Sequence, residues 1–168
     1  AVKTIAAASP HLVIMISNTA ASAAFIKQAK DAGLRTQFVA ISTTDATQLV
    51  DAIGAPTAAG VAITQVVPHP DNRTVPLSKE FKENFTKYKP EGVVYNHVLL
   101  EGYVGAKVLV EGLRRAGPGA TRKKLREALE QIKNYDLGDL LISYSPTNRA
   151  GTSFADINII SGNGVLLK

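Results

Sequence analysis

The sequence predicts an α/β fold in which a mainly parallel sheet lies between two layers of helices, giving a three-layer αβα arrangement. Short apolar runs alternate with segments whose apolar residues recur at helical spacing, which is typical of strand–helix–strand units. The apolar runs are also continuous, as in strands that are covered on both faces. Alternating strands and helices of these lengths favour right-handed crossovers and a parallel sheet with helices on both faces.

The first 67 residues contain three of these repeats. Gly33 and Gly54 are placed to end two of the helices, and Asp45 with Gln48 resembles a capping box at the start of the second. In chain order, we expect the end of a helix at 4–8, a strand at 11–17, a helix at 20–33, a strand at 36–42, a helix at 43–54 and a strand at 60–67.

Residues 68–76 interrupt the pattern, because PHPDNRTVP is polar and rich in proline, which central strands and helix interiors exclude. We interpret this stretch as a crossing between two parts of the fold, with a hinge at 66–70. The elements predicted after it are helices at 77–88, 95–116 and from 121, strands at 140–145 and 154–161, and a tight turn at 161–164.

Three glycines, Gly102, Gly105 and Gly112, fall inside the predicted helix at 95–116. Each costs about 1 kcal/mol relative to alanine in a helix interior. We therefore expect close packing against another element at these positions.

Length and composition indicate one folded domain without a membrane span. The chain has 168 residues, of which 45% are hydrophobic and 20% charged, and no apolar stretch reaches the roughly 18 residues that cross a bilayer. The net charge is +5, but the densest basic run, TRKKLREALEQI, soon meets Glu127 and Glu130, as on a solvated helix face. It also lacks interleaved aromatic residues, so no nucleic-acid partner is expected.

The sequence contains little that could support catalysis or metal binding. His11, His69 and His97 are isolated, there is no cysteine, and phosphate-loop, dinucleotide-binding and nucleophile-elbow motifs are missing. Asp45 and Asp51 are better explained by helix capping and solvation than by general acid–base catalysis. We therefore expect no enzyme activity, no metal and no cofactor.

Small polar side chains follow each of the three predicted parallel strands. In open parallel sheets, ligands bind outside the carboxyl ends of the strands, where helix N-termini present free N–H groups. Capping explains one such ending, whereas three neighbouring endings form a polar rim around one crevice. The candidate ligand-binding residues are Ser17, Asn18, Thr19, Ser42, Thr43, Thr44 and Gln65.

The order of elements resembles a known family. The segments AAFIKQAKDAGLRTQFVAIS, GVAITQVVP and LLEGYVGAKVLVEGLRRAG are similar to the second half of type I periplasmic solute-binding proteins of ABC transporters, the leucine/isoleucine/valine-binding protein family. The resemblance covers almost the whole chain and is a diffuse pattern without a short diagnostic motif.

This resemblance implies one lobe of a two-lobed receptor plus helices that belong to the other lobe. Residues 1–67 would form the second-lobe α/β core, 68–134 the hinge crossing and helices packing on the first lobe, and 135–168 the returning strands. The first lobe and the signal peptide would lie outside the chain, so the isolated chain is expected to self-associate or to retain a partner chain, and the missing N-terminal lobe is itself an implied partner. The implied location is the periplasm, and the implied partners are a small-molecule solute and an inner-membrane ABC permease.

The resemblance also bears on the identity of the solute, because this sequence departs from the amino-acid-binding members at two positions. Amino-acid-binding members hold the solute's ammonium with a glutamate at the position of Ser42 and pack a tyrosine near Asn18 or Thr19. Without that carboxylate, an ammonium loses a charge-assisted partner worth roughly 1.5–3 kcal/mol. The expected solute is an amino acid or a small organic or aromatic acid or amide.

Two other classes of function stay open at this point. A ligand-sensing domain of a regulator or receptor can have the same fold, and an upstream helix-turn-helix would favour it. The second of these classes is a doubly wound enzyme, for which the sequence contains no nucleophile–base pair.

Overall fold

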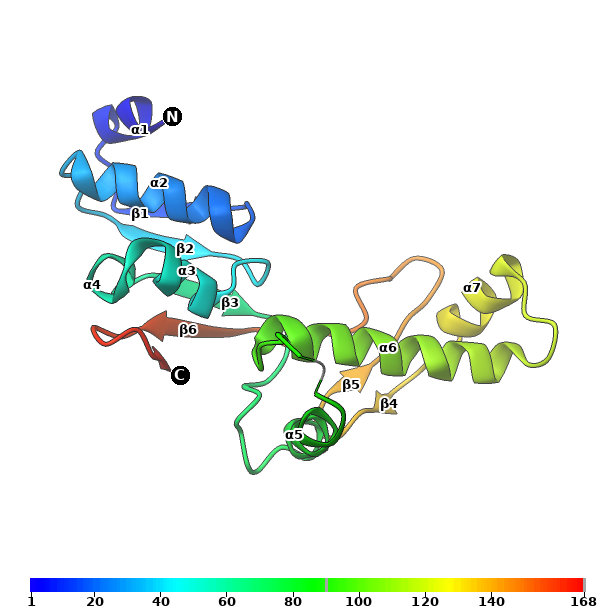
Figure 1. Ribbon diagram of the computed structural model, residues 1–168. Coiled ribbons are helices and arrows are strands. Elements are labelled where there is room, and N and C mark those ends of the chain that lie inside the picture. The colour runs from blue at the N-terminus through cyan, green and yellow to red at the C-terminus, as the bar shows by residue number, and fades with distance from the viewer. Residues whose placement is uncertain (90, 168) are drawn as a thin grey trace. The chain divides into compact units, whose positions relative to one another are not determined.

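The computed structural model describes residues 1–89 and 91–167 (Figure 1). The chain divides into two compact units. The first comprises Ala1–Gln65 together with the C-terminal residues from Ala155, and the second comprises Val66–Phe154. Within the described residues, none of the helices combines the length and the apolar character needed to cross a membrane.

The first unit is built on a five-stranded sheet in the order β1-β2-β3-β6-β7. Its strands are β1 (Leu12–Met15), β2 (Gln37–Ala40), β3 (Ala62–Gln65), β6 (Asp156–Ile160) and β7 (Leu166–Leu167). The first three strands are parallel, β6 is antiparallel to β3, and β7 is antiparallel to β6. The predicted α/β class and the three parallel strands are confirmed, and the complete sheet is mixed.

Four helices accompany this sheet: α1 (Val2–Ala7), α2 (Thr19–Asp31), α3 (Ala46–Ile53) and α4 (Ala55–Ala58). Figure 1 shows α2 and α3 lying over one face of the sheet. Ile26 of α2 and Leu49 of α3 are fully buried against Phe38 and Ile63 of the strands. Helix α4 was not predicted as a separate element, because Pro56 follows the end of α3 so closely.

The sequence predicts helices on both faces, but the described helices of the first unit pack on one face. The reason is handedness: β1, β2 and β3 follow one another in one direction across the sheet, and right-handed crossovers then place every connecting helix on the same side. Side chains that point to the other side, including Ile14 and Ile157, remain exposed.

The second unit is mainly helical. It contains α5 (Pro76–Tyr88), α6 (His97–Ala116) and α7 (Arg122–Glu130), followed by a hairpin of β4 (Tyr135–Asp136) and β5 (Leu141–Ile142). Its core includes Leu77 and Phe81 of α5, Leu100 of α6, and Ile132 and Leu140 beside the hairpin. Thr121 caps α7, as its Oγ1 accepts a hydrogen bond from the backbone N–H of Lys124.

The glycines of α6 differ in their surroundings. A Cβ at Gly112 would lie 2.6 Å from Cδ2 of Leu129 on α7, so close packing is present there. At Gly102 and Gly105, a Cβ would meet no described atom within 4 Å. The predicted close packing is therefore confirmed at Gly112 and absent at the other two positions within the described chain.

This difference predicts opposite effects of the same substitution on stability. Gly105→Ala should raise the free energy of unfolding by about 1 kcal/mol, because alanine has the higher helix propensity and the space is open. Gly112→Ala should lower it by about 1 kcal/mol, because overpacking against Leu129 costs more than the propensity gains. Urea unfolding of the two variants measures both values, and changes of equal sign would contradict the packing described for α6.

Candidate functional site

The candidate site lies where β1 and β2 end and α2 and α3 begin. Asn18 is the N-cap of α2, and its Oδ1 accepts a hydrogen bond of 3.0 Å from the backbone N–H of Ala21. Asp45 is the N-cap of α3, and its Oδ1 accepts one of 2.7 Å from the N–H of Gln48, as predicted for the capping box. Both helices therefore start at the same edge of the sheet, with the positive ends of their dipoles there.

Two hydrogen bonds tie the loops after β1 and β2 together. The hydroxyl of Thr43 donates to the backbone carbonyl of Ser17 over 3.0 Å. The backbone N–H of Asp45 donates to Oγ1 of Thr19 over 2.9 Å. The two segments, 26 residues apart in sequence, thus form one connected surface.

A chain of buried hydroxyls lies beneath this surface. Ser17 Oγ is 2.8 Å from Ser22 Oγ, and Ser22 Oγ is 3.4 Å from Thr44 Oγ1. Ser22 is fully buried and Thr44 is 2% exposed. Because these hydroxyls satisfy one another, Thr44 supports the loops from the buried side.

Ser42 and Gln65 differ from the other candidate residues. Ser42 is half-buried in the turn that follows β2, and its hydroxyl makes no hydrogen bond to any part of the chain that the structure describes. Gln65 is 3% exposed on β3, paired with Asp156 of β6, and no hydrogen bond between described residues joins it to the two loops. The structure therefore joins the loops of Ser17, Asn18, Thr19, Thr43 and Thr44 through their contacts. Ser42 lies in the same segment as Thr43, and the parallel register of β2 and β3 places Gln65 next to this segment.

This arrangement suits a solute that accepts hydrogen bonds. The first-turn N–H groups of a helix lack partners within the helix, so α2 and α3 offer donors at one edge. Ser42 adds a hydroxyl that can donate or accept. The described His, Asp and Glu side chains nowhere form a group of three that could hold a metal ion.

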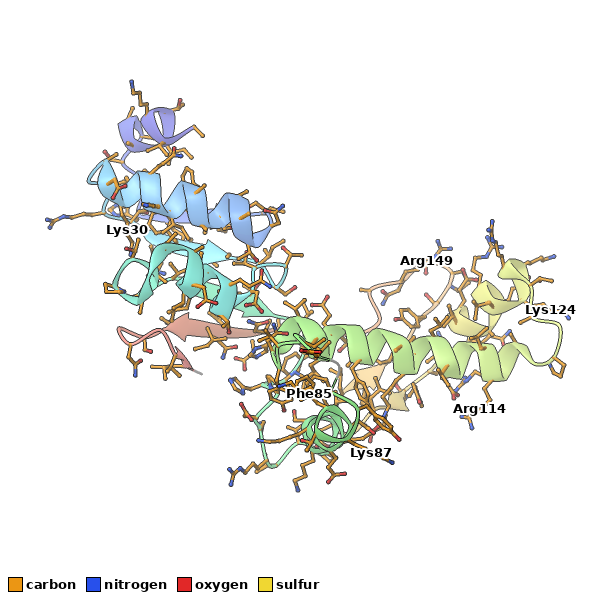
Figure 2. The ribbon with its side chains drawn as sticks, viewed as in Figure 1. Lys30, Phe85, Lys87, Arg114, Lys124 and Arg149 are labelled. Atoms are coloured by element: carbon orange, nitrogen blue, oxygen red, sulfur yellow. The ribbon has the colours of Figure 1, made fainter. Side chains whose placement is uncertain are left out.

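Sequence reasoning missed a second feature, an aromatic pocket in the second unit. The rings of Phe81 and Tyr95 stack with centroids 5.0 Å apart, and Tyr103 lies 5.4 Å from Phe81. The pocket has a volume of about 410 Å³ and is lined by residues of α5 and α6, among them Phe85, which Figure 2 labels. The only sequence signal was the helical spacing of the aromatic residues on α5, which equally fits a packed core.

An ion pair borders this aromatic pocket. Lys107 donates to both carboxylate oxygens of Glu80, at 2.7 and 2.5 Å, and the Tyr103 hydroxyl donates to Oε1 at 2.5 Å. Burial opposes ionisation of Glu80, but the hydrogen bonds and charge of Lys107 outweigh it and hold the pKa of Glu80 below its ordinary value. Burial and the Glu80 acceptor raise the pKa of Tyr103 to about 12.

Comparison with known proteins identifies what the chain resembles. A family model described as periplasmic binding protein matches residues 1–156. Among curated proteins, none matches the sequence.

Solved structures match nearly the full chain. A substrate-binding periplasmic protein from Ralstonia solanacearum is 27% identical with a TM-score of 0.86, and the match covers 99% of this chain and 47% of that one. An extracellular ligand-binding receptor from Verminephrobacter eiseniae is 26% identical with a TM-score of 0.83 and the same coverage. A possible leucine/isoleucine/valine-binding protein from Rhodopirellula baltica is 28% identical with a TM-score of 0.82, covering 95% of this chain and 43% of that one.

The present chain therefore spans about half the length of these structures. In each case the similarity extends over both units described above.

Replacement of two serines of the site by alanine is expected to change the free energy of unfolding by different amounts. Ser22→Ala should lower the free energy of unfolding by about 1–2 kcal/mol, because it leaves the hydroxyls of Ser17 and Thr44 without their shared partner. Ser42→Ala should change it by less than about 0.5 kcal/mol, because its hydroxyl has no partner in the described chain. Urea unfolding compares the two, and an equal loss in both variants would show that the hydroxyl chain does not hold the loops.

The lowered pKa of Glu80 predicts that its contribution to the free energy of unfolding depends on pH. A carboxylate whose pKa is depressed by folding contributes stability above its ordinary pKa of about 4.3, and this contribution is lost as the pH falls through the folded value. Glu80→Gln should therefore lower the unfolding midpoint at pH 7, and its difference from the parent protein should shrink as the pH falls below about 4.3. Glu83→Gln, at an exposed position on the same helix, is the control. A difference that is constant with pH would exclude an electrostatic role for Glu80.

Proposed function

Because the chain belongs to the periplasmic binding protein family, we propose that it is part of the extracytoplasmic solute receptor of an ABC importer. The solute is an amino acid or a related small carboxylate or amide, and it binds in a cleft between two lobes. The first unit supplies one wall of this cleft. The observation that supports this proposal most is the joined polar edge formed by the loops after β1 and β2.

The residues at this edge have separate roles in the proposal. Ser42 contacts the solute through its hydroxyl, and the N-termini of α2 and α3 bind its negatively polarised groups. Asn18 and Asp45 hold the helix starts in place through their caps. Thr19 and Thr43 keep the two loops in register.

No covalent chemistry is required of such a receptor. A solute that contacts both lobes favours the closed form by its higher affinity for that form, and a membrane permease recognises the closed form. The boundary between the two units, between Gln65 and Val66, coincides with the start of the proposed hinge at 66–70. Periplasmic location follows from the same proposal.

The proposal is tested on the full-length receptor. Native mass spectrometry of the purified protein identifies the retained solute, and calorimetry with that compound then gives the affinity. Ser42→Ala should weaken binding about two- to tenfold, the effect of one lost hydrogen bond. Ser153→Ala, exposed in the second unit, is the matched control and should leave the affinity unchanged.

The same calorimetry on the present chain should detect weak binding or none, because it supplies only part of the cleft. Micromolar binding by this chain alone would contradict a site shared between two lobes, and unchanged affinity in Ser42→Ala would remove Ser42 from the site.

A further inference from the structure

Most of the chain's net positive charge lies at one end of the second unit, where α6 ends and α7 begins. Residues 111–133 contain seven lysines and arginines and three glutamates, a net charge of +4, whereas the whole chain has a net charge of +5. Figure 2 labels Arg114 and Lys124 at this end. We name the exposed cations there the basic end; they are Arg114, Arg115, Arg122, Lys123, Lys124 and Arg126.

The three glutamates neutralise only part of the basic end. Glu111 is 5% exposed and accepts hydrogen bonds from the two arginines in the last turn of α6. Glu130 pairs with Arg149 at 2.9 Å, and Glu127 lies 4.0 Å from Lys123. The remaining cations of the basic end make no ion pair within the described residues; they are Arg122, Lys124 and Arg126.

The position of these charges does not serve the stability of α7. The N-terminus of a helix carries a partial positive charge, so acidic residues stabilise the first turn and cations destabilise it. Helix α7 begins Arg-Lys-Lys and has no acidic residue in its first turn. The side-chain charges therefore add to the charge of the helix end and create a strong positive potential on an exposed surface.

The chemistry of the basic end restricts the kind of partner. The cores of protein–protein interfaces are rich in aromatic residues and poor in lysine, and single-stranded nucleic acids stack on aromatic side chains. Residues 111–133 contain no phenylalanine, tyrosine or tryptophan. An anionic lipid surface needs only exposed cations, and each cation near it strengthens binding about fivefold.

We propose that the basic end binds an anionic lipid surface by electrostatic attraction. The cations contact the phosphate headgroups, and the second unit rests on the membrane without crossing it, since none of the described helices is long and apolar enough to do so. This interaction goes beyond solute binding. It holds the chain beside the membrane that contains the permease of the proposed function.

Vesicle sedimentation with the present chain tests the proposal. The probe is a vesicle of about one part phosphatidylglycerol to two parts phosphatidylcholine, and vesicles of phosphatidylcholine alone are the uncharged control. The chain should bind the anionic vesicles at least tenfold more tightly than the uncharged ones. Binding should fall at least tenfold between about 10 mM and about 150 mM salt, because the screening length shortens from about 30 Å to about 8 Å. The assay needs no solute, so its outcome is independent of the solute-binding test.

Two triple variants that lose the same charge locate the contact. Arg122→Gln with Lys123→Gln and Lys124→Gln should weaken binding about a hundredfold at low salt, since each lost cation counts about fivefold. The control replaces three exposed lysines outside the basic end by glutamine and should change binding less than about threefold. Its positions are Lys27, Lys79 and Lys87.

A variant with the opposite effect guards against misfolding as the cause of lost binding. Glu127→Gln removes a carboxylate that is 48% exposed beside the basic end, and it should strengthen binding about fivefold. The melting temperature of the Arg122, Lys123 and Lys124 triple variant should not fall, because cations at a helix N-terminus do not stabilise the helix.

Four results would overturn the proposal: no binding to anionic vesicles, equal binding to uncharged vesicles, equal losses in the two triple variants, or no gain in Glu127→Gln. A short DNA duplex that binds more tightly than the vesicles and is lost in the same triple variant would also overturn it, and would assign the basic end to nucleic acid.

Discussion

The right-handed connection between parallel strands is the constraint on which the first unit depends. Because β1, β2 and β3 follow one another in one direction, this handedness places α2 and α3 on one face. The parallel direction of the same strands brings their carboxyl ends to one edge, with the N-termini of both helices beside them. The polar edge of the site and the uncovered apolar face are therefore two consequences of the same chain path.

The sequence predicted those features that are encoded locally. The Asp45–Gln48 spacing predicted the start of α3, and the continuous apolar run at 11–17 predicted β1. It did not predict the hydroxyl chain of Ser17, Ser22 and Thr44, because its members come from three segments that only the fold brings together. Nor did it distinguish Gly112, which meets α7, from Gly105, which meets open space, because both occupy similar positions in the helical pattern.

The location of the candidate site stays a prediction, and the structure adds the contacts among its residues. Five of the residues named from sequence take part in the contacts of the two loops that follow β1 and β2. Their contacts differ: the hydroxyl of Thr44 is satisfied by buried Ser22, whereas the hydroxyl of Ser42 makes no hydrogen bond to the described residues. Hydroxyls and helix N-termini favour solutes with carboxylate or carbonyl groups, and a solute's ammonium would need its partner from another part of the receptor.

The central claim is that the loops after β1 and β2 form one wall of a solute cleft. A crystal structure of the full-length receptor with its co-purified solute tests this claim most directly. The account predicts that the solute lies within hydrogen-bond distance of Ser42 Oγ and of first-turn N–H groups of α2 or α3. A solute that contacts none of residues 17–19 and 42–44 would contradict it.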